Sequence, residues 1–313
     1  MTDGSVDDFS AGSVDGGAYL ARTAGGEVTL APKVAGEFTG EELPDGWTVT
    51  PWVDGGTGTL KEGMLALDGA RVGCEPLLPS PRALEFGAVF ASRPDQHIGF
   101  GTNFVDVPWV MFSTKWGRRL YGRTHLLNVE DTRLAGDWFD APHRFRIEWN
   151  VLDIVFSIDG GALGRILVPV PGYMRALAGN QRLGTEPLRV EWMRMSPYAP
   201  SGRFTSRVLD AGTRVGWGAA TWHADVPPAT SLRLHVRTGD VAGPDATWSA
   251  WAPVAAAGDP VGTTGRFLQY RADLATADPG WTPVLRRVAV AYSAAGAGES
   301  SRSSGSGSDL GCQ

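Results

Sequence analysis

The feature that most constrains this chain is an alternation of apolar and polar residues with a period of two, repeated in many short segments. The segments ALEFGAVFAS (83–92), HIGFGTNF (97–104), HRFRIEWN (143–150) and IVFSIDGG (154–161) all show it. Successive side chains of a strand point to opposite faces, so this spacing is typical of strands with one face in a core. No segment up to residue 292 has the spacing of a long amphipathic helix. The sequence therefore predicts an all-β fold.

The residues between these segments indicate which all-β architecture to expect. The chain has 42 glycines and 21 prolines among its 313 residues, and many short strands joined by turns are typical of sandwiches and jelly rolls. The 12 tryptophans are spread along the whole chain, which favours core filler over a single aromatic patch. We expect an antiparallel two-sheet jelly-roll sandwich followed by a second, smaller β-sandwich.

A proline- and glycine-rich segment, SPYAPSG (196–202), marks the expected domain boundary, because it follows a strand-like stretch. Residues 36–198 should form the jelly roll and residues 199–292 the accessory β-sandwich. The N-terminal segment 1–35 is expected to add a strand to one of the sheets. The tail 293–313 is small and polar, and its composition predicts disorder.

The segment GRRLYGRTH (117–125) combines an apolar face with a face of hydrogen-bonding side chains. Arg119, Tyr121, Arg123 and His125 alternate with residues that include Leu120. Antiparallel sheets commonly have one solvated face, so such a strand is either ordinary surface or the floor of a binding site. The sequence leaves both interpretations open.

A wider polar face follows if neighbouring strands share one sheet with this segment. We expect the strands around 97–104, 108–115, 118–126 and 144–149 to do so, with Phe104 directed inward. The outward face would then contain His97, Asn103, Arg119, Tyr121, Arg123, His125, Arg146 and Glu148. Gly99 and Gly101 would leave room for a ligand close to the backbone.

Charge and cysteine content exclude several classes of function. The net charge of −6 argues against a general nucleic-acid binder. Cys74 and Cys312 are the only cysteines, which excludes a disulfide framework and a cysteine zinc site. No apolar run is long enough to span a membrane. The acidic start lacks the regions of a signal peptide, so the chain is expected to be either cytoplasmic or a mature segment.

No motif in the chain indicates a cofactor. A phosphate-binding loop and a Gly-x-Ser-x-Gly nucleophile elbow are both missing from the sequence. The histidines at 97, 125, 143, 223 and 235 have no close metal-ligand spacing. Loop carboxylates such as Asp131 or Asp159 could hold a structural calcium ion, but no EF-hand-like run of oxygen ligands supports this. We therefore expect no cofactor.

The segment HRFRIEWNVLDIVFSIDGG (143–161) resembles a pair of strands in the concanavalin A-like lectin/glucanase superfamily, whose laminarinase-like members are glycoside hydrolases. LRVEWMRMSPY (188–198) and RALEFGAVFAS (82–92) are similar to other strands of that group. The resemblance covers residues 36–198 and implies a jelly roll whose concave sheet is the usual ligand site, in an extracellular or cell-surface protein. Residues 199–292 resemble β-sandwich modules appended to secreted bacterial glycan-acting proteins.

The chain departs from this family at the catalytic motif. Such hydrolases have Glu-x-Asp-x-x-Glu on one concave strand, because a retaining mechanism needs two carboxylates about 5 Å apart. No Glu-x-Asp occurs anywhere in this sequence. The strand expected in that place, PWVMFSTK (108–115), offers Trp109, Met111 and Ser113 instead. Hydrolysis by that mechanism is therefore not expected.

Three hypotheses of function remain, and the first is favoured. It is a lectin-like protein that binds a poly- or oligosaccharide, which can be acidic, on the concave face. The candidate ligand-binding residues are His97, Asn103, Trp109, Arg119, Tyr121, Arg123 and Arg146.

The second hypothesis is a lyase acting on a uronic-acid polymer. Arg119 or Arg123 would be the cation on the uronate, and His97, Tyr121 or His125 the base. The third hypothesis is a structural or adhesive module of a surface assembly, without a small ligand.

Overall fold

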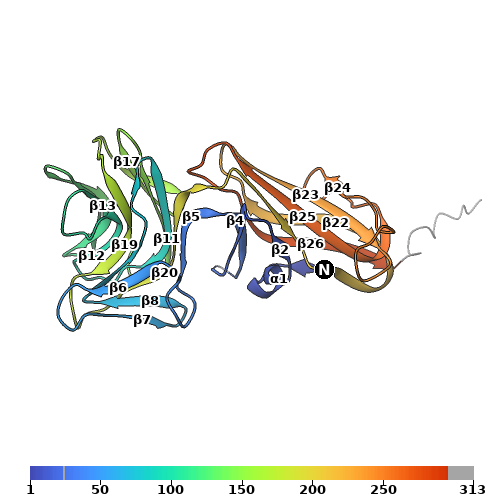
Figure 1. Cartoon of the computed structure of the whole chain (residues 1–313), viewed down its shortest axis with the longest axis horizontal. Coiled ribbons are helices and arrows are strands. Elements are labelled where there is room, and N and C mark those ends of the chain that lie inside the picture. The colour runs from blue at the N-terminus through green and yellow to red at the C-terminus, as the bar shows by residue number, and fades with distance from the viewer. Residues whose placement is uncertain (24, 295–313) are drawn as a thin grey trace, which may run out of the picture.

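A computed structural model describes residues 1–23 and 25–294, and its elements are almost entirely strands. Two parts lie side by side along the longest axis of the molecule (Figure 1). A short helix, α1 (Val6–Ser10), lies in the N-terminal segment and is capped by Ser5. Among the described residues, no helix has the length and apolar character needed to cross a membrane. The predicted all-β class is confirmed.

The first part is a sandwich of two antiparallel sheets of eight strands each. We call one of them the front sheet. Its order is β15 (Val129–Leu134), β14 (Arg119–His125), β13 (Trp109–Lys115), β12 (Gln96–Gly101), β19 (Tyr173–Asn180), β9 (Ala70–Cys74) and β6 (Trp47–Pro51), with β10 (Leu78–Pro79) paired to β19.

The second sheet, which we call the back sheet, covers the inner face of the front sheet. Its order is β18 (Gly161–Ile166), β17 (Ile154–Ile158), β16 (His143–Trp149), β11 (Arg82–Val89), β20 (Leu188–Tyr198), β8 (Met64–Asp68) and β7 (Thr57–Lys61), with β5 (Pro32–Glu37) paired to β20. The two-sheet antiparallel sandwich expected from the sequence is thus confirmed.

Aromatic side chains from both sheets fill the space between them. The Phe145 ring stacks on Phe86 with 5.2 Å between centroids, and it meets the edge of Phe112, from the other sheet, at 5.1 Å. Phe156 also packs against Phe112, at 5.2 Å. All four side chains are fully buried. This core explains the period-two alternation, since each strand contributes every second residue to it.

The second part is built around its own core by one continuous sheet of ten strands. The C-terminal half of the chain supplies β21 (Ser201–Thr205), β22 (Leu209–Asp225), β23 (Thr230–Gly239), β24 (Ala252–Val254), β25 (Thr264–Thr276) and β26 (Val284–Ala294). The N-terminal segment supplies β1 (Thr2–Asp3), β2 (Ser13–Val14), β3 (Ala18–Ala21) and β4 (Glu27–Leu30).

The N-terminal segment therefore lies on the sheet formed by the far end of the chain. Strand β4 pairs with β26, and the amino group of Met1 donates to Val290 O at 2.7 Å. The chain crosses between the two parts twice, from Ala31 to β5 and from β20 to β21. The two crossings contact each other, because Ala199 N donates to Ala31 O at 2.9 Å.

The contact between the two parts is polar and lies on the outward face of the back sheet. Arg194 of β20 is only 2% exposed, and it forms ion pairs with Glu27 at 3.1 Å and with Glu37 at 3.0 Å. Glu27 belongs to the second part and also pairs with Arg286 of β26, at 3.1 Å. A buried group of opposite charges thus joins the two parts.

One strand assignment made from the sequence is wrong. Residues 144–149 were expected in the same sheet as 97–126, but β16 pairs with β11 and β17 in the back sheet. Period-two alternation gives the face of a strand but not its sheet, because both sheets of a sandwich show the same pattern. Of the predicted disordered tail, residues 295–313 lie outside the described residues.

Candidate functional site

The outward face of the front sheet brings most of the predicted site residues together. Directly paired residues on neighbouring strands share a face, so the register defines rows of side chains across the sheet. One row contains His97, Ser113, Tyr121 and Arg133. The next contains Met111, Arg123 and Asp131, and a third contains Arg175, Trp109 and His125.

Arg123 lies at the centre of this face and contacts all three rows. Its Nε donates to Asp131 Oδ1 at 2.7 Å, and its Nη1 donates to Ser113 Oγ at 3.3 Å. Its guanidinium also lies over the Trp109 ring, 5.5 Å from the centroid. Trp109 in turn packs against His125, with 5.3 Å between ring centroids. These contacts fix the orientation of the guanidinium.

Positive charge dominates this face. Six cationic side chains point outward from the described strands of the front sheet: Arg71, Lys115, Arg119, Arg123, Arg133 and Arg175. Among the same outward positions we find a single carboxylate, Asp131, which pairs with both Lys115 and Arg123. These two cations hold the pKa of Asp131 below its usual value although burial raises it. A cationic face on a chain of net charge −6 is a local concentration of charge.

His97 lies on this face but is covered. Its side chain is 8% exposed, and the rings of Trp52 and Phe104 lie 5.7 and 6.2 Å from it. Its Nδ1 forms a hydrogen bond with Ser113 Oγ at 3.0 Å. Burial, helped by the nearby charge of Arg123, lowers the pKa of His97 to about 4. His97 is therefore neutral at neutral pH and a weak base.

The space beside the two glycines of β12 is occupied by other atoms of the protein. The expectation that these glycines leave room for a ligand is therefore wrong. A Cβ on Gly99 would lie 2.0 Å from Val110 O on the neighbouring strand. A Cβ on Gly101 would lie 3.1 Å from Phe104 and 3.3 Å from Leu177. Phe104, expected inward, instead packs outside the sheet with Trp109, Met111 and Leu177, next to Trp52. Its backbone φ of 62° turns the chain back over β12.

This apolar cluster divides the face into two halves. The half over β9, β12 and β19 is filled by the cluster of Trp52, Phe104 and Leu177. The half over β13, β14 and β15 remains accessible, because Tyr121, Arg123 and His125 are partly exposed and Arg119 and Arg133 are exposed. Any ligand on this face would therefore contact the second half.

Two of the predicted ligand-binding residues lie elsewhere. Asn103 is in the loop after β12, where its side chain donates to Asp106 Oδ2 at 2.7 Å and stabilises a turn. Arg146 is a correction: it projects from β16 on the back sheet and stacks on Trp281 of the second part, 3.5 Å from the ring centroid. Glu148 was expected on the same face, but it also lies on β16 of the back sheet. Its Oε1 accepts a hydrogen bond from Arg146 Nε at 3.0 Å.

Sequence reasoning missed Arg71, Lys115, Arg133 and Arg175 as members of this face. Each of these four residues alternates with buried residues of its own strand, so the period of two is consistent with an outward side chain. Nothing in the local sequence shows that β9 and β19 adjoin β12, because these strands are far apart in the chain. Strand pairing, which is non-local, had to be known first.

The two carboxylates considered for calcium have protein partners. Asp131 pairs with Lys115 and Arg123 as described above, and Asp159 accepts His143 Nδ1 at 2.8 Å and Arg144 N at 2.9 Å. Over the described residues, no group of three or more histidine, cysteine, aspartate or glutamate side chains has a geometry that could hold a metal ion.

Comparisons with known proteins find resemblance only among solved structures. The glycosyl hydrolase family protein from Mycobacterium fortuitum is 14% identical, with 53% of this chain and 100% of that chain covered at a TM-score of 0.42. The β-glucanase from Bacillus licheniformis is 14% identical, with 53% and 98% covered at a TM-score of 0.39. β-Agarase A from Zobellia galactanivorans is 12% identical, with 48% and 81% covered at a TM-score of 0.36.

No protein-family model matches the chain, and a search of the curated proteins gives no match. The similarity to these solved structures extends over about half of the chain. The architecture itself rests on the strand order and register described above.

Proposed function

We propose that this chain is a non-catalytic glycan-binding protein that holds an acidic polysaccharide on the outward face of the front sheet, over β13, β14 and β15. The observation that supports this best is the charge of that half of the face, where the four cations Lys115, Arg119, Arg123 and Arg133 stand against one carboxylate, Asp131. Guanidinium groups bind carboxylates and sulfates through paired hydrogen bonds. Such a role fits an extracellular or cell-surface protein.

Tyr121 and His125 supply the aromatic part of this proposed site, while Trp109 is only 7% exposed and packs beneath Arg123. Sugar rings have apolar faces that pack on aromatic side chains, while their hydroxyl groups form hydrogen bonds. Tyr121 lies beside the Lys115 ammonium group, 4.4 Å from its ring centroid, so an aromatic surface and a cation are adjacent. An acidic sugar residue presents both an apolar face and an anion.

The same face argues against two-carboxylate hydrolysis and against His97 as the base of a lyase. Retaining and inverting hydrolysis both use a pair of carboxylates, and Asp131 is the single carboxylate among the outward positions of the described front-sheet strands. A lyase needs a base with a pKa near the working pH. His97 has a pKa of about 4 and lies under Trp52 and Phe104, so it meets neither the chemical nor the steric requirement.

The proposal is tested by measuring binding to polygalacturonate and alginate, with the neutral polymer dextran alongside. We expect binding to both polyuronates, weakened by added sodium chloride because exposed charges are screened. Arg123→Met should weaken binding roughly ten- to a hundredfold, the value of a charge-assisted contact. Arg118→Met is the matched control, because Arg118 lies in the turn before β14 and pairs with Asp137 and Asp140.

Four outcomes would overturn the proposal. Ultraviolet absorbance from unsaturated uronates would favour the lyase hypothesis. Equal affinity for duplex DNA would show that the face is a non-selective cationic surface. Equal loss of binding in Arg118→Met and Arg123→Met, or no binding to either polyuronate, would leave the structural or adhesive hypothesis.

A further inference from the structure

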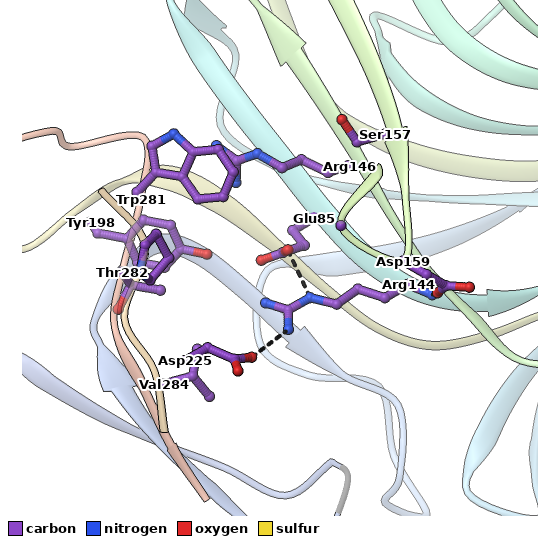
Figure 2. Close-up of a pocket in the computed structure, with 12 residues that line it drawn as sticks. Glu85, Arg144, Arg146, Ser157, Asp159, Tyr198, Asp225, Trp281, Thr282 and Val284 are labelled. Atoms are coloured by element: carbon purple, nitrogen blue, oxygen red, sulfur yellow. Dashed lines mark hydrogen bonds and ion pairs between the residues drawn. The ribbon is translucent and has the colours of Figure 1, made fainter. Parts of the chain in front are cut away.

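A cavity of about 360 Å³ lies between the two parts of the molecule, on the side of the sandwich opposite the front sheet (Figure 2). Its floor is the outward face of the back sheet, with Glu85, Arg144 and Tyr198, and its roof is the second part, with Asp225 and Trp281. The volume is at the lower end of the range found for small-molecule sites. Because both parts line it, the cavity exists only in the assembled molecule.

Several polar groups in this cavity have hydrogen-bonding capacity that the protein does not use. Tyr198 is 4% exposed, and its hydroxyl group has no hydrogen-bond partner among the described residues. Ser157 Oγ, on the floor, is likewise unpaired within the described part of the chain. Neither hydroxyl group is among the buried unpaired atoms of the described residues, so both are open to solvent, and a bound molecule would take the place of water as their partner.

Arg144 and Glu85 add further donors and acceptors. Arg144 uses Nε to donate to Glu85 Oε1 at 2.8 Å, while its Nη1 is 3.9 Å from Asp225 Oδ2, beyond hydrogen-bond distance. The two Nη atoms and Glu85 Oε2 therefore remain available. Figure 2 shows Arg144 and Glu85 directed at the space between the two parts.

The charges around the cavity are close to balance, which decides the class of ligand. Two guanidinium groups, Arg144 and Arg146, face three carboxylates, Glu85, Asp159 and Asp225, of which Asp159 already accepts hydrogen bonds from His143 Nδ1 and Arg144 N. The pairing with Arg144 lowers the pKa of Glu85 although burial raises it, so this carboxylate stays ionised. Burial raises the pKa of Tyr198 to about 12, so its hydroxyl keeps its proton. An anion would be repelled by the three carboxylates and a cation by the two guanidinium groups, whereas a neutral molecule would be repelled by neither.

One wall of the cavity is aromatic. The Trp281 indole is held by Arg146, whose guanidinium stacks on it at 3.5 Å and donates through Nη2 to Gly280 O at 2.8 Å. Val284 and Pro227 extend the apolar surface beside it. A fixed indole next to interspersed donors and acceptors suits a molecule with an apolar ring face and several hydroxyl groups.

We infer that this cavity binds a neutral sugar residue, with its ring packed on Trp281 and its hydroxyl groups bonded to Tyr198, Arg144 and Glu85. This site is separate from the proposed site on the front sheet and does not rest on it, because the two lie on opposite faces of the sandwich. The ligand classes also differ, one being anionic and the other neutral.

The test is saturation-transfer NMR with the methyl glycosides of glucose, galactose, mannose and N-acetylglucosamine at millimolar concentration, with methyl glucuronoside as the charged comparison. We expect transfer from the protein to at least one neutral glycoside and weaker transfer to the glucuronoside. Trp281→Ala should abolish the signal. Tyr198→Phe should weaken affinity about two- to tenfold, the value of one hydrogen bond.

Tyr198→Phe also tests the structural basis without a ligand. Because the hydroxyl has no protein partner, its removal should leave the melting temperature unchanged or higher, which separates a loss of binding from a loss of folding. Trp116→Ala is the control for an exposed tryptophan outside the cavity, since Trp116 is 68% exposed in the β13–β14 turn. It should leave the signal unchanged.

The inference fails if none of the four neutral glycosides receives saturation, or if the glucuronoside binds more tightly than all of them. It also fails if binding survives both Trp281→Ala and Tyr198→Phe but is lost in Arg123→Met, because the ligand would then lie on the front sheet. That pattern would leave the proposed function standing while removing this second site.

Discussion

The arginine side chains on the two outward faces of the sandwich have opposite environments. On the back sheet, Arg144 and Arg194 are paired with carboxylates, and Arg194 is covered by the second part of the molecule. On the front sheet, Arg119 and Arg133 are exposed and make no ion pair within the described residues. Both faces come from strands with the same alternation. The period-two alternation determines which residues point outward. Whether those residues form ion pairs or stay exposed depends on whether another part of the molecule packs on that face.

The physical cost of burial explains why the two faces differ. A guanidinium group moved out of water must recover its hydration through ion pairs and hydrogen bonds. Arg194 does so with two carboxylates and the hydroxyl group of Thr23, at 2.7 Å. An exposed guanidinium keeps its water and needs no such partner, so it remains free to bind an anion.

The largest expected effect comes from breaking the back-sheet group of charges. Arg194→Met removes the cation and leaves Glu27 and Glu37 buried with less compensation, so unfolding should become easier by about 3–5 kcal/mol. Chemical denaturation measures this change. The control is Arg203→Met, because Arg203 pairs with Asp273 but its side chain is about half exposed, at 52%. Similar losses in the two variants would contradict the distinction between a covered and an exposed arginine.

The next effect concerns His97, the one buried histidine on the front face. An unfolded histidine has a pKa near 6.5 and His97 has a pKa of about 4, so the unfolded state binds the proton more readily. Stability should be unaffected above about pH 6.5 and fall by about 3 kcal/mol as the pH drops to about 4. In His97→Gln this part of the pH dependence should vanish. Parallel profiles for the two proteins, or an NMR titration of His97 near pH 6.5, would show that the ring is not desolvated.

A smaller effect is expected from Asp131, the carboxylate that opposes the cations of the front face. Asp131→Asn frees Arg123 and Lys115 from their ion pairs. Binding of polygalacturonate should strengthen several-fold, while the free energy of unfolding should change by less than about 1 kcal/mol because the pairs are partly exposed. Titration calorimetry and denaturation measure the two quantities. Weaker binding would mean that Asp131 positions Arg123 for the ligand instead of competing with it.

The smallest expected effect concerns proteolysis of residues 196–202, which should stay uncut. A proline- and glycine-rich segment between two domains is ordinarily a site of proteolysis, but the backbone of residues 196–202 is well bonded here. Tyr198 N donates to Pro279 O at 2.8 Å, and Thr276 N donates to Pro200 O at 3.0 Å. Native-state proteolysis should therefore spare this segment and cut first near Leu127, which is 86% exposed in the β14–β15 loop. Early fragments ending at 196–202 would show that the contact between the parts opens readily.

The sequence was sufficient for the fold class and, in the strands it identified, for the side that faces out, with Phe104 as the exception. It gave Trp109, Tyr121, Arg123 and His125 a common face because they lie on two adjacent strands joined by a short turn. It failed for Arg146, whose strand has the same alternation but belongs to the other sheet. Period two cannot distinguish the two sheets of a sandwich.

The cavity between the two parts was beyond the reach of sequence analysis for a different reason. Glu85, Tyr198 and Trp281 come from three distant stretches of the chain. Each by itself is an unremarked residue of a strand or loop. They become a group only when the second part packs against the back sheet, and no local pattern encodes that contact.

The double crossing of the chain between the two parts has a mechanical consequence. A single linker lets one part twist freely about it, but two neighbouring crossings, hydrogen-bonded to each other from Ala199 to Ala31, oppose twisting. Cutting the chain at residues 199–200 alone would leave the parts tied through Ala31. The second part is also incomplete without the first 30 residues, since β3 and β4 extend the sheet beyond β26. The sandwich is in effect a domain inserted into the second part, and both of its chain ends are attached to that part.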